Sequence, residues 1–452
     1  MSFFLIKEPS FFLIINLILL STKAKAFFAN NKPPTIASWF DISFTFIFLF
    51  AILTSVVALL WLNFRQDKAI SNSFDTVPEG FNETIELKDH QKAGNYTKAK
   101  LRLNHFEIIF STIILLLWTL GGAMNWMDGF WSERISDPVL MGTFFILSIM
   151  LIASFIDLPF SIYRNFVLEQ KFGFNRMTVG TFAGDLIKEL ILSLVIVLPL
   201  IYVILFLMNF ETIGNYWWIY VWAIISLFSL IMMWIYPSFI APIFNKFNPL
   251  DNETLKARIT NLLERTGFGS DGIFVMDGSK RSSHGNAYFT GIGKNKRIVF
   301  FDTLLKGMED KEIEAILAHE LGHFHHKHTR QRMISSFIFS FVSLALLGYL
   351  INQTWFYNGL GVSQPSSHAA LVLFSLTLPV FSFFITPISN LMSRKHEFQA
   401  DAFAASHTDA KDLISSLIKL YKENSSSLSP DKYYSAFHDS HPSAVLRIER
   451  LQ

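Results

Sequence analysis

The residues with the clearest chemistry lie in the segment AILAHELGHFHHKHTR, which runs from Ala315 to Arg330. His319 and His323 are four residues apart, so on a helix they lie one turn apart on one face and can share a metal ion. Glu320 lies beside them and can take a proton from a metal-bound water. This His-Glu-x-x-His pattern predicts a zinc hydrolase with two protein ligands and a general base.

A zinc ion that keeps one position open for water needs a third protein ligand. The chain has no cysteine, so the ligand must be a histidine or a carboxylate. The segment SRKHEFQADAFAAS carries Glu397 and Asp401 at a spacing of four, on one face of a predicted helix. Glu397 is expected to complete a site for one Zn²⁺ per chain. Asp401 is expected to accept the second ring proton of a ligand histidine and to orient it.

The remaining histidines of the segment allow other interpretations. Metalloproteases of the Met-turn type would have glycine at 326 and histidine at 329, and here these positions hold His326 and Thr329, which excludes that subclass. We expect His325, His326 and His328 to form the solvated end of the helix. Without the other ligand, the whole segment could instead be a histidine-rich helix end that docks to a membrane surface.

The histidine segment needs a folded support, and the polar region between Asn245 and Arg332 supplies one. PLDNETLKARITNLLERTGF predicts an amphipathic helix that begins at Asp251 or Asn252 and ends near Gly267. GIFVM, NAYFTGI and RIVFF predict three short strands of a small sheet beside the histidine helix. The histidine helix itself is expected to begin near the acidic pair at 309 and 310.

The rest of the composition is typical of an integral membrane protein. Hydrophobic residues make up 51% of the chain and charged residues only 16%, against roughly 25% in soluble domains. A net charge of +2 gives no reason to expect nucleic acid as a partner. Seven uncharged apolar stretches are long enough to span a bilayer. They are Ile42–Phe64, Ile108–Met127, Val139–Ile156, Ile191–Met208, Trp217–Phe239, Met333–Leu350 and Ala369–Leu391.

The charges between these stretches predict an orientation. Lys and Arg gather in the first, third and fifth loops and after the seventh stretch, whereas the second, fourth and sixth loops hold only Arg134. Basic loops stay in the cytosol, so we expect the N-terminus outside and the C-terminus in the cytosol, in a bacterial inner membrane or the endoplasmic reticulum. FFLIINLILL followed by AKA suits either a cleaved signal peptide or an interfacial helix.

These observations predict a mainly α protein. It consists of a seven-span transmembrane helical barrel or bundle with a small α+β zinc-peptidase domain of the gluzincin-like kind, in which a glutamate is the third ligand. The expected segments are 1–35 as a signal-like or interfacial region, 36–244 with spans one to five, 245–332 as the catalytic segment, 333–392 with spans six and seven, and 393–452 with the third zinc ligand.

Several motifs together resemble the type I CAAX prenyl proteases, which are multi-spanning zinc metalloproteases related to bacterial heat-shock membrane proteases. The resemblance rests on GSKRSSHGNAYFTGIGKNKRIVFFDTLL, HELGH, SRKHEFQADAFA and DSHPSAVLRIERL, and it covers most of the chain from about Asp157. It implies that His319, His323 and Glu397 bind zinc and that Glu320 activates its water. It also implies a large water-filled chamber enclosed by the seven helices.

The same resemblance implies roles for further residues. Asp401 matches an acidic residue sometimes assigned as a proton donor, and His441 and Arg447 match residues placed near the reacting carbonyl. Asn286 and Ala287 match the edge strand that holds the substrate backbone. His284, in the same motif, is grouped with them as substrate-binding. The common form of the His-Pro motif has a second proline, where this chain has serine at 443.

Two functions fit this resemblance, and a third belongs to another class. The protein would remove the last three residues of prenylated CAAX proteins, or it would cleave membrane proteins in quality control without a need for prenylation. Its partners would then be a peptide or protein substrate and the lipid bilayer, with the oligomeric state left open. A zinc-free transport or binding protein is the alternative, since many proteins with seven spans have those functions.

Overall fold

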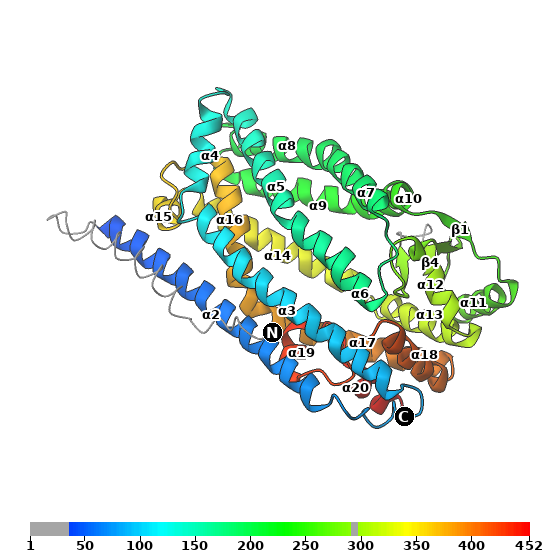
Figure 1. Ribbon diagram of the computed structural model, residues 1–452. Coiled ribbons are helices and arrows are strands. Elements are labelled where there is room, and N and C mark those ends of the chain that lie inside the picture. Colours follow the sequence, from blue (N-terminus) through cyan, green and yellow to red (C-terminus); the bar gives the residue numbers. More distant parts are fainter. Residues whose placement is uncertain (1–35, 291–296) are drawn as a thin grey trace.

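Seven long helices form the main body of the protein, and the sheet and the shorter helices lie at the two ends of these helices (Figure 1). The computed structural model describes residues 36–290 and 297–452, and seven of its helices are long and apolar enough to cross a membrane. The predicted segment 1–35 lies outside the described residues. The spans are formed by α2 (Ile36–Asn72), α3 (Leu87–Trp118), α5 with α6 (Pro138–Ile162, Gln170–Phe172), α7 with α8 (Val179–Leu192, Leu198–Met208), α9 with α10 (Trp217–Ile235, Ala241–Phe244), α14 (His328–Leu350), and α16 with α17 (Ser367–Ser382, Thr386–His407).

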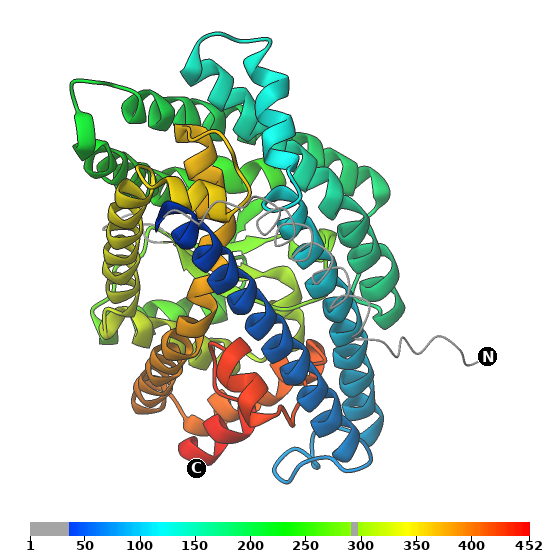
Figure 2. The same cartoon turned by 90° about the vertical axis from the view of Figure 1, so that its left-hand side faces the viewer.

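The spans follow one another around a closed ring. Each packs on its neighbour in the order α2, α3, α5, α8, α9, α14 and α16, and α16 returns to α2. Figure 1 shows the ring from the side, with the small sheet at one end and α4 (Ala123–Ser132) and α15 (Thr354–Gly359) at the other. In Figure 2 the ring is turned toward the viewer. The structure thus confirms a seven-span helical barrel with a small sheet.

The barrel is closed at the end that carries α4 and α15. Phe145, Phe356 and Tyr357 are fully buried there in one apolar core. The helices α5 and α16 touch because residue 142 is glycine, since a Cβ atom at Gly142 would lie only 2.9 Å from Cβ of His368. Side chains therefore fill this end of the barrel, and the described cavities lie at the other end, near the sheet.

The expected second span, Ile108–Met127, is wrong at its C-terminal end. The helix α3 ends at Trp118, and the apolar residues that follow belong to the separate short helix α4. Gly122 has a φ of +82°, a left-handed conformation that helices do not continue through. The apolar composition carries on across this break because α4 covers the closed end of the barrel and is itself packed in its core.

The helices also extend beyond their apolar stretches, toward the sheet. All the basic residues attributed to the first loop, from Arg65 to Arg102, lie on these extensions of α2 and α3. Arg65, on α2, pairs with Asp431 at 2.8 Å. Such contacts attach the barrel to the C-terminal helices α18 (Ala410–Glu423), α19 (Lys432–His438) and α20 (Ala444–Leu451).

The catalytic segment is a four-stranded sheet with helices packed on it. The strands β1 (Phe247–Pro249), β2 (Ile273–Met276), β3 (Ala287–Thr290) and β4 (Arg297–Phe301) lie in the order β1-β2-β4-β3, so β3 is an edge strand. The three predicted strands are confirmed over the described residues, and Gly291 and Ile292 at the end of the second predicted run lie outside them. The predicted amphipathic helix is α11 (Glu253–Thr266), which is capped by Asn252 and ends at Gly267 in a left-handed conformation. The short helix α12 (Asp302–Gly307) leads to the histidine helix α13 (Asp310–His325).

Candidate active site

The histidine helix α13 is anchored at both its start and its apolar face. Glu309 caps it, and a capping box joins Glu309 and Glu312, as the acidic start predicted. The Glu312 carboxylate is buried and accepts hydrogen bonds from Ser415 and Lys419 on α18. Ile313, Leu317 and Leu321 are buried in the core shared with α11 and the sheet, so the opposite face with the two histidines is held in place.

The third predicted ligand reaches the histidines because α13 and α17 cross at very short range. Gly322, inside the His-Glu-Leu-Gly-His motif, faces Ala400 of α17. A Cβ atom at Gly322 would lie 2.8 Å from the Ala400 Cα atom and 3.1 Å from Cβ of Phe403. Only a hydrogen fits in this space. Glu397, which precedes Ala400 by about one turn, therefore lies directly opposite the histidine pair.

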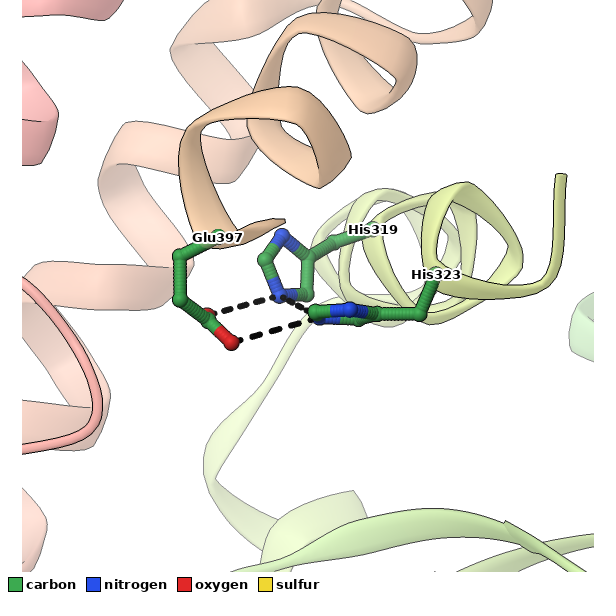
Figure 3. Close-up of side chains that lie close together, drawn as sticks. All are labelled: His319, His323 and Glu397. Atoms are coloured by element: carbon green, nitrogen blue, oxygen red, sulfur yellow. Dashed lines mark hydrogen bonds and ion pairs between the residues drawn. The ribbon is translucent and has the colours of Figure 1, made fainter. Parts of the chain in front are cut away.

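Figure 3 shows His319, His323 and Glu397 pointing toward one another from the two helices. The two Nε2 atoms are 3.3 Å apart, and each lies 3.4 Å from one oxygen of Glu397. Two ligands bound at about 2.0–2.1 Å to a tetrahedral zinc ion are themselves about 3.4 Å apart. The Oε2 atom of Glu397 is buried and has no hydrogen-bond partner among the described residues. The donors, their spacing and this unsatisfied oxygen all fit a zinc ion.

A buried carboxylate orients the first histidine. Asp401 Oδ1 lies 2.8 Å from His319 Nδ1, and Arg447 donates a hydrogen bond to Asp401 Oδ2 at 2.8 Å. This contact directs the Nε2 atom of His319 toward the metal position. With both oxygens engaged, Asp401 acts as an acceptor in this structure rather than as a proton donor. Arg447 is buried, and its Nη2 also lies 3.3 Å from His319 Nδ1, a position that suits a group supporting both Asp401 and His319.

The two histidines differ in their affinity for protons. Burial lowers the pKa of His319, but its contacts with Asp401 and Glu397 outweigh burial and raise that pKa to about 9. Burial, together with the neighbouring His319, lowers the pKa of His323 to about 3. In the metal-free protein at neutral pH, these pKa values make His319 the cationic imidazole and His323 the neutral one. Burial also raises the pKa of Glu320, which suits a group that must take up a proton.

The expectation that all three remaining histidines form a solvated end is wrong for His328. His325 is exposed and His326 half-buried, but only 1% of His328 is exposed. Its Nδ1 lies 3.0 Å from Nδ1 of the predicted ligand His323. The spacing of five residues did not predict this contact, because two residues five apart on one continuous helix point in different directions. Here the helix ends at His325 and a new one begins at His328.

Two cavities share His441, beside the candidate metal site. One, of about 720 Å³, is lined by Glu320, His323, Glu397 and His441 together with apolar side chains of α9. The other, of about 690 Å³, also reaches His441. His441 Nε2 lies 3.4 Å from Glu397 Oε1, and the side chain is 63% exposed. The structure thus brings His441 to the rim where Glu320 and the ligands face open space.

The predicted backbone-binding strand borders the first cavity. Tyr288 and Phe289 of β3 line it, and β3 pairs only with β4, which leaves its other edge free among the described strands. Asn286 is exposed at the start of this edge. Its side-chain oxygen accepts a hydrogen bond from the Ala287 amide at 2.8 Å.

His284 lies behind the wall of the second cavity, where it contacts the lining residues Glu169 and Asn424. Its Nδ1 is 3.0 Å from Asn424 Oδ1, its Nε2 is 3.4 Å from Glu169, and its ring stacks on Phe174. Because Glu169 also accepts a hydrogen bond from Tyr96, this network joins the catalytic segment to two spans. His284 lines neither of the two cavities at the metal site. The geometry therefore supports a structural role for His284.

Comparisons with known proteins agree with this geometry. Residues 66–246 match the model of the CAAX prenyl protease N-terminal region with five membrane helices, and residues 249–452 match the model of peptidase family M48. A CAAX prenyl protease 1 homolog of Arabidopsis thaliana is 39% identical over 403 residues, which are 86% of this chain and 93% of that protein. The chain belongs to the CAAX prenyl protease family of M48 peptidases.

Other family members are similar over nearly their whole length. The CAAX prenyl protease 1 homolog of Homo sapiens is 32% identical over 90% of this chain and 95% of its own. The crystal structure of Ste24p from S. mikatae covers 93% of this chain and 100% of its own, with 32% identity and a TM-score of 0.83. The protein is therefore a multi-pass membrane metalloprotease. An enzyme of family M48 requires a metal, which excludes the zinc-free transporter considered from the sequence.

Sequence reasoning missed three residues of this M48 site. Gly322 lies inside the motif but becomes informative only when α17 is placed against it. His328 follows a reversal of the chain, and its partner Gln399 lies on α17 next to the third ligand. A polar residue two positions after Glu397 was the only available signal for Gln399.

Proposed function

We propose that the protein is a zinc endopeptidase that cleaves near the C-terminus of prenylated CAAX proteins, with zinc held by His319, His323 and Glu397. The curated relatives are named as CAAX prenyl proteases. The observation that carries the proposal is the pair of cavities that share His441, one with an apolar wall from α9 and the other with Lys100 and Arg164 in its lining. A prenylated C-terminus is likewise apolar on one side of the cleaved bond and charged on the other.

The cavity beside His323 suits the lipid. Its walls include Phe228, Met232 and Met233 from α9 and Phe289 from β3. Flexible methionine side chains and aromatic rings adapt to a long apolar group, and burying each methylene contributes about 0.8 kcal/mol. This cavity adjoins the span α9, so a prenyl group could pass from the bilayer with little exposure to water.

The cavity beyond His441 suits the free carboxylate of the substrate. Two cations, Lys100 and Arg164, line it together with the carboxylates of Glu107, Glu169 and Asp439. Arg164 already pairs with Glu107 at 2.6 Å, whereas the Lys100 ammonium lies over the Tyr96 ring, 4.7 Å from its centroid. Lys100 is therefore the better partner for a carboxylate. Three extended residues beyond the cleaved bond reach about 10 Å.

The mechanism follows from the placement of the protein groups. A zinc ion held by His319, His323 and Glu397 would supply a Lewis acid for the scissile carbonyl and the attacking water. Glu320 takes the proton of the attacking water and passes it to the leaving amine. His441, exposed at the rim, donates a hydrogen bond to the developing oxyanion, which is typically worth a few kcal/mol. The free edge of β3 holds the substrate as an added strand.

The test compares three substrates with the purified full-length enzyme in lipid. We expect a farnesylated CAAX peptide to be cleaved at least tenfold more efficiently than the same peptide without farnesyl, and an unmodified membrane protein to be cleaved slowly. Equal kcat/KM values for the first two substrates would contradict the prenyl assignment and support the quality-control function. Mass spectrometry of the released peptide identifies the cleaved bond.

We also propose that the catalytic end faces the cytosol and the end with α4 and α15 the opposite side. The first and third loops, rich in basic residues, contact the catalytic and C-terminal segments, as in the 3.2 Å pair of Lys422 with Asp89. The chain has no cysteine, so single exposed cysteines can be labelled without background. In sealed vesicles with cytosolic side outward, Asp271→Cys should react with a membrane-impermeant maleimide and Glu133→Cys should not. The reverse pattern would invert the assignment.

A further inference from the structure

A buried histidine outside the ligand set contacts the second zinc ligand. His328 Nδ1 lies 3.0 Å from His323 Nδ1, and His328 Nε2 lies 2.9 Å from Gln399 Oε1. The His328 ring lies nearly parallel to two others, the ring of His396 at 4.0 Å and 13° and the ring of His326 at 5.4 Å and 18°. Its position and ring plane are therefore fixed from several sides.

The backbone bends sharply to make this contact. Lys327, between α13 and α14, has φ 58° and ψ 29°, the left-handed conformation that costs a residue other than glycine roughly 1–2 kcal/mol. This residue reverses the chain, so that His328 at the start of α14 returns beneath His323. Strained residues of this kind persist where the surrounding structure determines them and often lie at functional sites.

Two hydrogen bonds join Gln399, His328 and His323, and together they fix which ring nitrogens carry the protons. The Gln399 oxygen accepts from Nε2–H of His328, which leaves Nδ1 of His328 as an acceptor for Nδ1–H of His323. Nε2 of His323 then carries a lone pair that points toward Glu397 and the metal position. If the Gln399 amide were turned over, its NH₂ group would donate to Nε2 of His328, and Nδ1–H of His328 would donate to Nδ1 of His323. The proton of His323 would then lie on Nε2, where it would block coordination.

One contact competes with this arrangement. Arg332 Nη2 lies 3.5 Å from His323 Nδ1, and a donor there would favour the opposite tautomer. This distance is at the limit of a hydrogen bond, whereas the His328 contact at 3.0 Å is ordinary. The geometry therefore favours His328 as the partner of His323.

We infer that His328 and Gln399 are positioning residues that select the metal-binding tautomer of His323. On the other side of the site, Asp401 and Arg447 do the same for His319, so each imidazole ligand has its own two-residue support. The inference deepens the proposed zinc-peptidase function and rests on it. Outer partners of metal ligands typically change metal affinity or activity 10–100-fold when they are replaced.

The test measures zinc affinity of the full-length protein by competition with a chelator, and the absorption spectrum of the cobalt(II) form. Gln399→Met removes the acceptor with little change of shape, and Gln399→Glu keeps an acceptor that cannot reverse. We expect 10–100-fold weaker zinc binding and an altered cobalt spectrum for Gln399→Met, and values within about threefold of wild type for Gln399→Glu. His328→Ala should resemble Gln399→Met. His328→Asn, whose oxygen can replace Nδ1 as an acceptor, should bind more tightly than His328→Ala.

The control is His325→Ala, at the same helix end but exposed, which should bind zinc as the wild type does. Thermal unfolding of the metal-free proteins verifies folding. Gln399 is only half-buried, so its variants decide the question even where replacing the buried His328 prevents folding. Equal zinc affinity of Gln399→Met and Gln399→Glu would overturn the inference. A wild-type protein that binds no zinc would instead contradict the proposed function.

Discussion

The close crossing of α13 and α17 makes Gly322→Ala the most informative substitution. The added Cβ atom would lie 2.8 Å from the Ala400 Cα atom, whereas non-bonded carbon atoms prefer about 3.5–4.0 Å. The helices would have to separate by roughly 0.7 Å or more to restore an ordinary contact. Glu397 moves with α17, so its oxygens would leave the histidines by a similar distance.

The magnitude of this shift decides what is lost. Coordination distances are held within about ±0.2 Å, so a separation several times larger weakens zinc binding. A misplacement of about 1 Å near a reacting centre can lower activity about 100-fold. The fold should survive, because overpacking costs about 1–3 kcal/mol and alanine recovers up to about 1 kcal/mol of helix propensity. We expect zinc affinity and kcat/KM to fall about 100-fold in a folded protein.

The assay measures zinc affinity, kcat/KM for the farnesylated peptide and the melting temperature of the metal-free protein. The matched control is Gly184→Ala in α7, where the same methyl group meets no atom within 4 Å. It should leave all three quantities unchanged or raise the melting temperature slightly. If Gly322→Ala bound zinc and cleaved substrate within twofold of the wild type, close helix contact would not be what sets the ligand geometry.

Three further predictions concern single groups of the site. Glu320→Gln should keep zinc in metal analysis but lower kcat by about 10²–10⁴, because no base remains to take the water's proton; full activity would remove Glu320 from this role. Lys100→Gln should raise KM for a peptide with a free C-terminal carboxylate about tenfold and leave the KM of the C-terminal amide unchanged; equal effects on both peptides would exclude a carboxylate contact. Since metal-free His319 is protonated below a pKa of about 9, zinc must displace one proton, so zinc affinity measured between pH 6 and 8 should rise about tenfold per pH unit. An affinity independent of pH would contradict that protonation state.

Much of this site can be read from the sequence because its signals are local. The spacing of His319 and His323 on one helix, the acidic start of that helix at Glu309 and the amphipathic pattern of α11 depend only on helix geometry and capping. The signal for the spans is equally local, since a sufficiently long apolar stretch is enough to predict one. The same local signal failed at Trp118, where the chain leaves the helix but stays apolar, because α4 also lies in a dry core.

The sequence by itself determined that a metal-binding helix, a small sheet and seven spans exist, and it proposed Glu397 as the third ligand from one helical spacing. Only the tertiary structure decided how closely α17 approaches α13, which is possible because residue 322 has no side chain. The structure also decided that the left-handed Lys327 turns the chain so that His328 contacts His323. It also decided that Arg447 lies behind Asp401 and that His284 lies outside the two cavities at the metal site. The physical reason is range: helix periodicity acts over a few residues, whereas these contacts join segments whose approach depends on the packing of the whole fold.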